Sequence, residues 1–229
     1  MRGIFITFEG IDGSGKSTQL QMLAGDLRSA GFNVLTTMEP GGTPLGRELR
    51  KAFLETAEAV DPLAELLLFA ADRAQHVRFL IKPGLEAGNI VISDRYADAT
   101  FAYQGAGRGF SKDLVKQVIK LASDDLKPDL TLFFDLSVEL ALERTKLRHN
   151  ENSESKNRMD DEKKDFYQRV REAYLELVRL EPQRFAVIDA SLSIEEIHRK
   201  VSETINKLLA ERPKFKSSRQ IFSSKSLKT

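Results

Sequence analysis

The chain has 229 residues, 41% of them hydrophobic and 30% charged, which favours a globular protein with a buried core. The absence of cysteine excludes disulfides and cysteine-ligated zinc, and no apolar run approaches the ~18 residues of a membrane-spanning helix. The N-terminal apolar run is too short for a signal peptide, so we expect a cytoplasmic location.

The predicted elements alternate in type along the chain. Gly31 would end the first helix, residues 39–44 contain two prolines and form a loop, and Ser137 would cap the helix after the fourth strand. Strands that alternate with helices form right-handed βαβ units, so the expected fold class is α/β, a five-stranded parallel sheet with helices on both faces. Strands are expected at 4–8, 34–37, 89–93, 130–136 and 185–188, and the main helices at 16–30, 62–81, 97–104, 111–122, 160–180 and 194–210.

The net charge of +1 is unevenly distributed. Residues 212–229 hold six basic side chains and no acidic one, so subtracting six from +1 leaves about −5 for residues 1–211. A negative net charge over residues 1–211 is unlike the basic surface of a general nucleic-acid-binding protein. No nucleic-acid or membrane partner is therefore expected. We expect one domain over residues 1–211 and a basic tail over 212–229 that is too polar to order itself.

Residues 10–17 match the G-x-x-x-x-G-K-[ST] pattern of a P-loop, between a predicted strand and a predicted helix. Backbone N–H groups would converge there on phosphate oxygens at the positive end of the helix dipole. Lys16 would reach the β- and γ-phosphates, and the Ser17 hydroxyl would ligate Mg²⁺. The residues expected to bind ATP in this loop are Gly10, Ile11, Asp12, Gly13, Ser14, Gly15, Lys16, Ser17 and Thr18.

Asp94 and Arg95 directly follow the third predicted strand. Ligands of open α/β sheets bind at the carboxyl ends of the strands. Asp94 would therefore hold Mg²⁺, directly or through water, and Arg95 would bind a phosphate with two N–H groups. A structural ion pair at the strand end is the alternative.

The pattern favours a kinase over a switch GTPase. The N-K-x-D run that reads guanine is absent, since Asn206-Lys207 is followed by two leucines. Two anionic substrates need arginines between them and a lid that excludes water. A lid is expected over about residues 149–160, with Arg144, Arg148 and Arg158 beside or within it; an ordinary solvated loop is the alternative.

Five separated motifs lie at residues 8–18, 39–43, 68–73, 94–96 and 102–105. Together they resemble the thymidylate kinase family, a branch of the P-loop nucleoside monophosphate kinases, over most of residues 3–210. The resemblance implies a P-loop NTP-hydrolase-type fold, a homodimer, and Mg²⁺-dependent transfer of the ATP γ-phosphoryl group to dTMP. The products would be dTDP and ADP, on the route to dTTP for DNA replication.

The resemblance also assigns roles around the acceptor base. Phe69 would stack on thymine, although alone it reads more simply as a core residue. Arg73 lies one helical turn further on and would hydrogen-bond the base edge. Thr100 and Gln104 match the other base-contacting positions, and Tyr103 matches the aromatic residue that leaves no room for a ribose 2′-hydroxyl.

Further roles concern the phosphates and ATP. Asp12 resembles the carboxylate near the acceptor sugar and the metal, while Arg95 and Arg50 resemble ligands of the acceptor phosphate. Arg144 resembles the arginine that covers adenine, and the loop at 189–191 resembles the segment that closes over that base.

Three departures from the family pattern bear on catalysis. Ala99 stands where a serine is frequent, the predicted lid is not rich in arginine, and Ser14 occupies a P-loop position where some members have a catalytic arginine. A lid arginine would then neutralise the charge of the transition state. Arg158 is the first candidate for this role and Arg148 the second. Another monophosphate or deoxynucleoside kinase, or a non-catalytic nucleotide sensor, is the alternative reading.

Overall fold

The computed structural model describes residues 2–56, 58–151, 159 and 162–212. Arg158, most of the predicted lid and the tail after residue 212 lie outside them. In the described part, no helix is long and apolar enough to cross a membrane.

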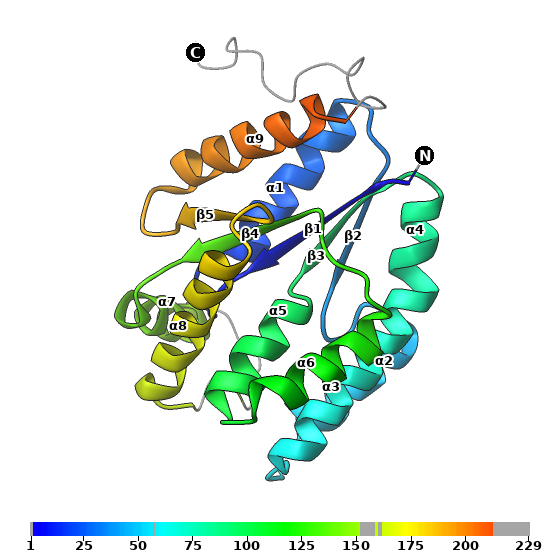
Figure 1. Cartoon of the computed structure of the whole chain (residues 1–229). Coiled ribbons are helices and arrows are strands. Elements are labelled where there is room, and N and C mark those ends of the chain that lie inside the picture. Colours follow the sequence, from blue (N-terminus) through cyan, green and yellow to red (C-terminus); the bar gives the residue numbers. More distant parts are fainter. Residues whose placement is uncertain (1, 57, 152–158, 160–161, 213–229) are drawn as a thin grey trace.

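A parallel sheet forms the centre of the fold, and the described residues give it five strands (Figure 1). The spatial order is β2-β3-β1-β4-β5, and every neighbouring pair is parallel. The predicted α/β class is therefore confirmed, with shifts of one residue at strand ends. The strands are β1 (Ile4–Glu9), β2 (Val34–Met38), β3 (Ile90–Asp94), β4 (Leu130–Asp135) and β5 (Phe185–Asp189).

Helices cover both faces of this sheet. Figure 1 shows α1 and α9 packed side by side on one face, with α3, α5 and α6 on the other. β1 is buried along its whole length, as expected of a central parallel strand covered on both sides. The helices are α1 (Lys16–Ser29), α2 (Pro44–Leu54), α3 (Pro62–His76), α4 (Lys82–Glu86), α5 (Ala97–Thr100), α6 (Lys112–Ser123), α7 (Val138–Glu151), α8 (Lys164–Leu180) and α9 (Ile194–Ala210), with two π-helical segments, η1 (Val77–Ile81) and η2 (Phe101–Gly107).

Several helix boundaries follow the local signals. Gly31 has φ +89° and follows α1, with the N–H of Phe32 bonded back to the carbonyl of Leu27, as in a Schellman motif. The Ser137 hydroxyl accepts a bond from the N–H of Leu140 at 3.4 Å, which confirms the predicted cap of α7.

Other boundaries were predicted wrongly. The helix expected at 160–180 begins at Lys164, because Lys163 has extended backbone angles and is the N-cap residue. The helix after the fourth strand, whose end was not predicted, continues to Glu151 and so includes the first residues of the expected lid. The helix expected at 97–104 continues to Gly107 in π-helical form.

The carboxyl ends of the strands meet at one edge of the sheet. Phe8 of β1 pairs with Asp94 of β3, and Glu9 pairs with Phe133 of β4. After β1 the chain builds β2 and β3 on one side of that strand and then β4 and β5 on the other, so the carboxyl end of β1 lies at the switch point where α/β folds bind ligands.

Candidate active site

The loop between β1 and α1 has the backbone of a phosphate cradle. Gly10 has φ +142° and Gly13 has φ +81°, a region that other residues rarely adopt. A Cβ on Gly13 would lie 2.4 Å from the carbonyl oxygen of Ala141, and one on Gly10 would lie 2.6 Å from that of Phe134. Both positions therefore require glycine for conformation and for space.

Lys16 lies over this loop, and its positive charge is only partly balanced by the groups around it. Its Nζ donates to the carbonyl of Ile11 at 3.0 Å and to the Ser14 hydroxyl at 3.4 Å, both neutral acceptors. Burial, followed by the charge of Arg95, lowers the pKa of Lys16 to about 8, although nearby carboxylates oppose the shift. A phosphate at this place would stabilise the charged form and raise the pKa again.

Ser17 and Asp94 join the start of α1 to the end of β3. The Ser17 hydroxyl donates to Asp94 Oδ2 at 2.6 Å. A hydroxyl and a carboxylate beside a phosphate cradle are the hard oxygen ligands that Mg²⁺ takes in nucleotide sites. The donor set of this pair therefore fits the predicted metal.

Arg95 stands between the cradle and the cavity described below. Its Nη2 donates to Asp12 Oδ1 at 2.8 Å and to the Tyr103 hydroxyl at 3.0 Å. Its Nη1 is buried with no hydrogen-bond partner among the described residues. Its backbone has φ +67°, which costs a non-glycine residue about 1–3 kcal/mol. A strained backbone and an unused charged donor at one residue indicate an anion site.

A cavity opens beside Asp12 and Arg95, and the predicted acceptor residues gather on its wall. It also includes residues to which the sequence assigned no role, namely Glu39, Pro40, Leu54, Tyr96 and Met159, and it includes Ala99. The predicted residues that line it are Asp12, Arg50, Phe69, Arg73, Arg95, Thr100, Tyr103 and Gln104.

Arg73 is fully buried and held from three sides. Its Nε donates to Glu39 at 2.8 Å, its Nη1 to the Thr100 hydroxyl at 2.8 Å and its Nη2 to the carbonyl of Tyr96 at 3.0 Å. Nη2 also lies 2.8 Å from Glu39 Oε2, so four of the five N–H donors of the guanidinium are used and one on Nη1 remains for a ligand. Burial acts to raise the pKa of Glu39, but Arg73 and His76 outweigh it and lower that pKa.

The apolar part of the wall comes from α2 and α3. Phe69 is half-buried and meets Phe53 edge to face, with ring centroids 4.8 Å apart. Arg50 is fixed through Nη1 to the carbonyl of Pro40 at 3.0 Å. An aromatic face and an arginine on one wall suit a flat base that carries a phosphate.

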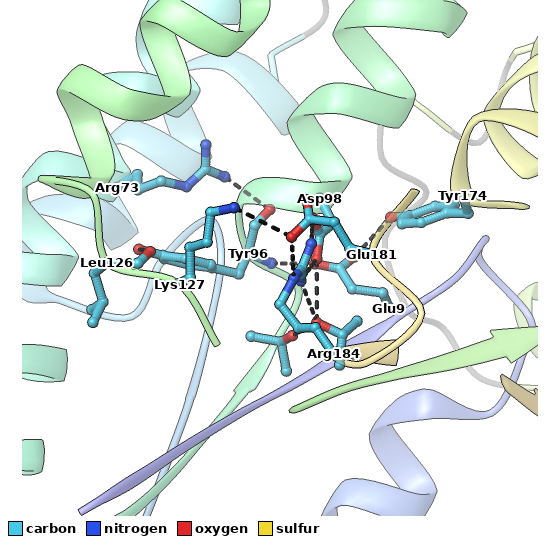
Figure 2. A network of polar contacts seen from close by, with 11 residues as sticks. Glu9, Arg73, Tyr96, Asp98, Leu126, Lys127, Tyr174, Glu181 and Arg184 are labelled. Carbon is cyan, nitrogen blue, oxygen red and sulfur yellow. Dashed lines mark hydrogen bonds and ion pairs between the residues drawn. The ribbon is translucent and has the colours of Figure 1, made fainter. Parts of the chain in front are cut away.

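Tyr96 follows the third strand and lies on the cavity wall. Figure 2 shows the polar contacts around it. Its N–H donates to Glu9 Oε1 at 2.7 Å, and its hydroxyl donates to the carbonyl of Leu126 at 3.1 Å. Glu9 also accepts from the Tyr174 hydroxyl at 2.7 Å. Burial, reinforced by Asp98, raises the pKa of Glu9 to about 8. These contacts fix the backbone that carries Arg95.

The predicted adenine-side residues also come together. Arg144 of α7 donates through Nη1 to the carbonyl of Ala190 at 2.9 Å, in the loop after β5. Arg148 lies one turn further along α7. The structure therefore joins the arginine and the loop that the sequence placed beside the same base.

Comparisons with known proteins agree with this geometry. The family model for thymidylate kinase matches residues 8–201. A thymidylate kinase of Halothermothrix orenii is 50% identical over 201 residues, which cover 88% of this chain and 95% of the relative. One of Pelobacter propionicus is 47% identical over 197 residues, covering 85% and 90%.

The chain belongs to the thymidylate kinase family. The crystal structure of thymidylate kinase from Ehrlichia chaffeensis superposes with a TM-score of 0.71 at 35% identity, covering 90% of this chain and 99% of the other. Members of the thymidylate kinase family are phosphotransferases that act on dTMP. The family and the fold predicted from the motifs are thus confirmed, while the roles of single residues stay predictions.

Proposed function

We propose that the chain transfers the γ-phosphoryl group of ATP to the 5′-phosphate of dTMP and yields dTDP and ADP. The observation that carries this proposal is the position of Arg95 and Asp12. They join the phosphate cradle to the cavity through a 2.8 Å ion pair, so two phosphorylated ligands bound on either side would meet at the Nη1 of Arg95.

On the donor side, the backbone of residues 10–18 cradles the ATP phosphates and Lys16 neutralises them. Arg144 lies over adenine together with the loop at 189–191. Ser17 and Asp94 would hold Mg²⁺, which would supply neutralisation of the phosphate charge.

On the acceptor side, Phe69 stacks on the base while Arg73 and Gln104 read its edge, with Thr100 holding Arg73 in place. Tyr103 excludes a 2′-hydroxyl, and its own hydroxyl is fixed by Arg95. Arg50 and Arg95 bind the acceptor phosphate.

The chemistry needs no covalent intermediate and no general base, because the attacking oxygen belongs to an ionised phosphate. Catalysis is alignment plus neutralisation of charge on the transferring group. Lys16, Arg95 and a lid arginine share that charge, with Arg158 the first choice and Arg148 the second. Arg158→Ala should lower kcat far more than it weakens dTMP binding.

The decisive experiment is an acceptor panel of dTMP, UMP, CMP, GMP, AMP and thymidine, each with Mg·ATP. We expect dTMP to be the best acceptor and Lys16→Ala to remove turnover. Preference for another monophosphate, or for thymidine itself, would refute the assignment. ATP binding without product would favour a nucleotide sensor.

We also propose a homodimer in the cytoplasm. Exposed leucines lie on α2, α3 and α6, and α3 packs against both of the other helices (Figure 1). A second copy that covered these leucines would remove apolar surface from water. Light scattering should give twice the chain mass, and a monomeric mass at micromolar concentration would refute it. The leucines are Leu45, Leu63, Leu67, Leu114 and Leu121.

A further inference from the structure

The side-chain amide of Gln104 is held at one end by a buried carboxylate. Gln104 lies in η2 on the cavity wall, and its Nε2 donates to Oε1 of Glu65, a residue of α3, at 2.8 Å. Gln104 is 1% exposed and Glu65 is 0% exposed. Neither side chain therefore has water as an alternative partner on that side.

Glu65 is itself fixed by Arg108, which follows η2. Arg108 donates through Nε to Glu65 Oε1 at 3.1 Å and through Nη2 to Oε2 at 3.0 Å, a two-point contact. Arg108 also lies over the ring of Phe166, 5.0 Å from its centroid, and pairs with Glu162. The carboxylate thus has a fixed position and a fixed partner.

This arrangement decides which end of the Gln104 amide meets a ligand. A carboxylate paired with a guanidinium only accepts hydrogen bonds, so the NH₂ group of Gln104 must face Glu65. The carbonyl Oε1 is then the group that Gln104 offers to the cavity. Arg73 offers only N–H donors. The cavity wall therefore presents one acceptor, Oε1 of Gln104, and one donor, an N–H group of Arg73.

Thymine and uracil match that pair, because N3–H is a donor and O4 beside it an acceptor. Cytosine presents the reverse, an N3 lone pair and an amino group at C4. It would place acceptor against acceptor and donor against donor. Buried polar groups left unpaired in this way are costly, and sites built to hydrogen-bond a ligand reject mismatched ones strongly.

We propose that Glu65 is a specificity-determining residue that acts through Gln104, with Arg108 as its positioning partner. Its fixed carboxylate selects nucleotides whose base carries N3–H, and so excludes cytidine nucleotides. The proposal rests on the proposed function, since it concerns the acceptor site of that reaction. The contact between Glu65 and Gln104 does not involve the 5-methyl group of thymine, so it does not affect discrimination between dTMP and dUMP.

The test compares kcat/KM for dTMP, dUMP and dCMP in wild type, Glu65→Gln and Glu162→Gln. In Glu65→Gln the new amide can donate or accept, so the Gln104 amide can rotate and offer its NH₂ group to the N3 lone pair of cytosine. The mismatch between Arg73 and the C4 amino group remains, so the selectivity is reduced and not reversed. We expect the dTMP/dCMP ratio to fall by roughly ten- to a hundredfold. The dTMP/dUMP ratio and the KM for ATP should stay within about twofold. Glu162→Gln removes the other carboxylate from Arg108 and should leave both ratios unchanged.

The outcomes separate this inference from the proposed function. No turnover of dTMP by wild type would refute the function. Turnover of dTMP with an unchanged dTMP/dCMP ratio in Glu65→Gln, or with equal changes in Glu162→Gln, would refute only the role of Glu65. A binding titration of wild type with N3-methyl-dTMP covers the case in which Glu65→Gln fails to fold. At least tenfold weaker binding than dTMP is expected, and equal binding would refute the acceptor at Gln104.

Discussion

Replacing Lys16 with methionine should abolish turnover and yet stabilise the nucleotide-free protein. Burial lowers the pKa of Lys16 from 10.5 to about 8, so at pH 7 the folded state carries a positive charge that destabilises it. At about 1.4 kcal/mol for each pKa unit, this shift corresponds to a cost of about 3 kcal/mol. Methionine removes that cost and also the two hydrogen bonds of Nζ, each worth about 1 kcal/mol. A net gain of about 1–2 kcal/mol remains, or roughly 2–8 °C in Tm.

The pH dependence distinguishes this cause from better packing. A lysine whose folded pKa is lowered costs stability below that pKa, and the cost fades as pH rises toward the unfolded value. The advantage of Lys16→Met should therefore be full below pH 8 and lost by about pH 10.5. Thermal melts in phosphate-free buffer measure it, with Lys207→Met on the exposed side of α9 as the matched control. A Lys16→Met variant that is less stable at pH 7, or whose advantage does not change with pH, contradicts the reasoning.

Three further substitutions test other parts of the site. Gly13→Ala should abolish ATP binding and lower the free energy of unfolding in urea by at least ~2 kcal/mol, because φ is +81° and the Cβ meets a carbonyl of α7. Gly25→Ala within α1 is the control and should raise that free energy by about 0.5–1 kcal/mol. Equal effects of the two substitutions would contradict the reasoning. Arg184→Met leaves the Asp98 carboxylate buried and unpaired and should cost about 3–5 kcal/mol in the same assay, and a loss under 1 kcal/mol would contradict it. Tyr103→Ala should raise kcat/KM for UMP relative to dUMP, and no gain would argue against steric exclusion.

Local patterns were sufficient for the parts of the site that are continuous in sequence. The phosphate cradle depends on glycines at fixed spacing, and the strand ends depend on short apolar runs that stop at a carboxylate such as Asp94. Both signals are read within about ten residues. Local signals therefore located the cradle and the carboxyl ends of the strands, whereas the roles of residues on the cavity wall came only from the resemblance to the family.

Long-range polar partners left no such signal. Glu65 and Gln104 are 39 residues apart, and Arg184 lies 86 residues from Asp98. These contacts have no local signal in the sequence, because polar pairs of this kind are defined only by the packing of separate segments. The start of α8 was misplaced as well, because the extended backbone of Lys163 has no signal in the local sequence.

The unfavourable features of the site have a common origin in the phosphates that it is built to hold. Lys16 is buried with neutral acceptors, and Arg95 combines a strained backbone with a buried donor that has no partner among the described residues. Each feature lowers the stability of the free protein, and each is relieved when an anion binds. Part of the gross binding energy of two phosphorylated substrates is thereby offset, while the donors stay fixed in place for the transition state. Removing either cation should for this reason weaken catalysis more than it harms the fold.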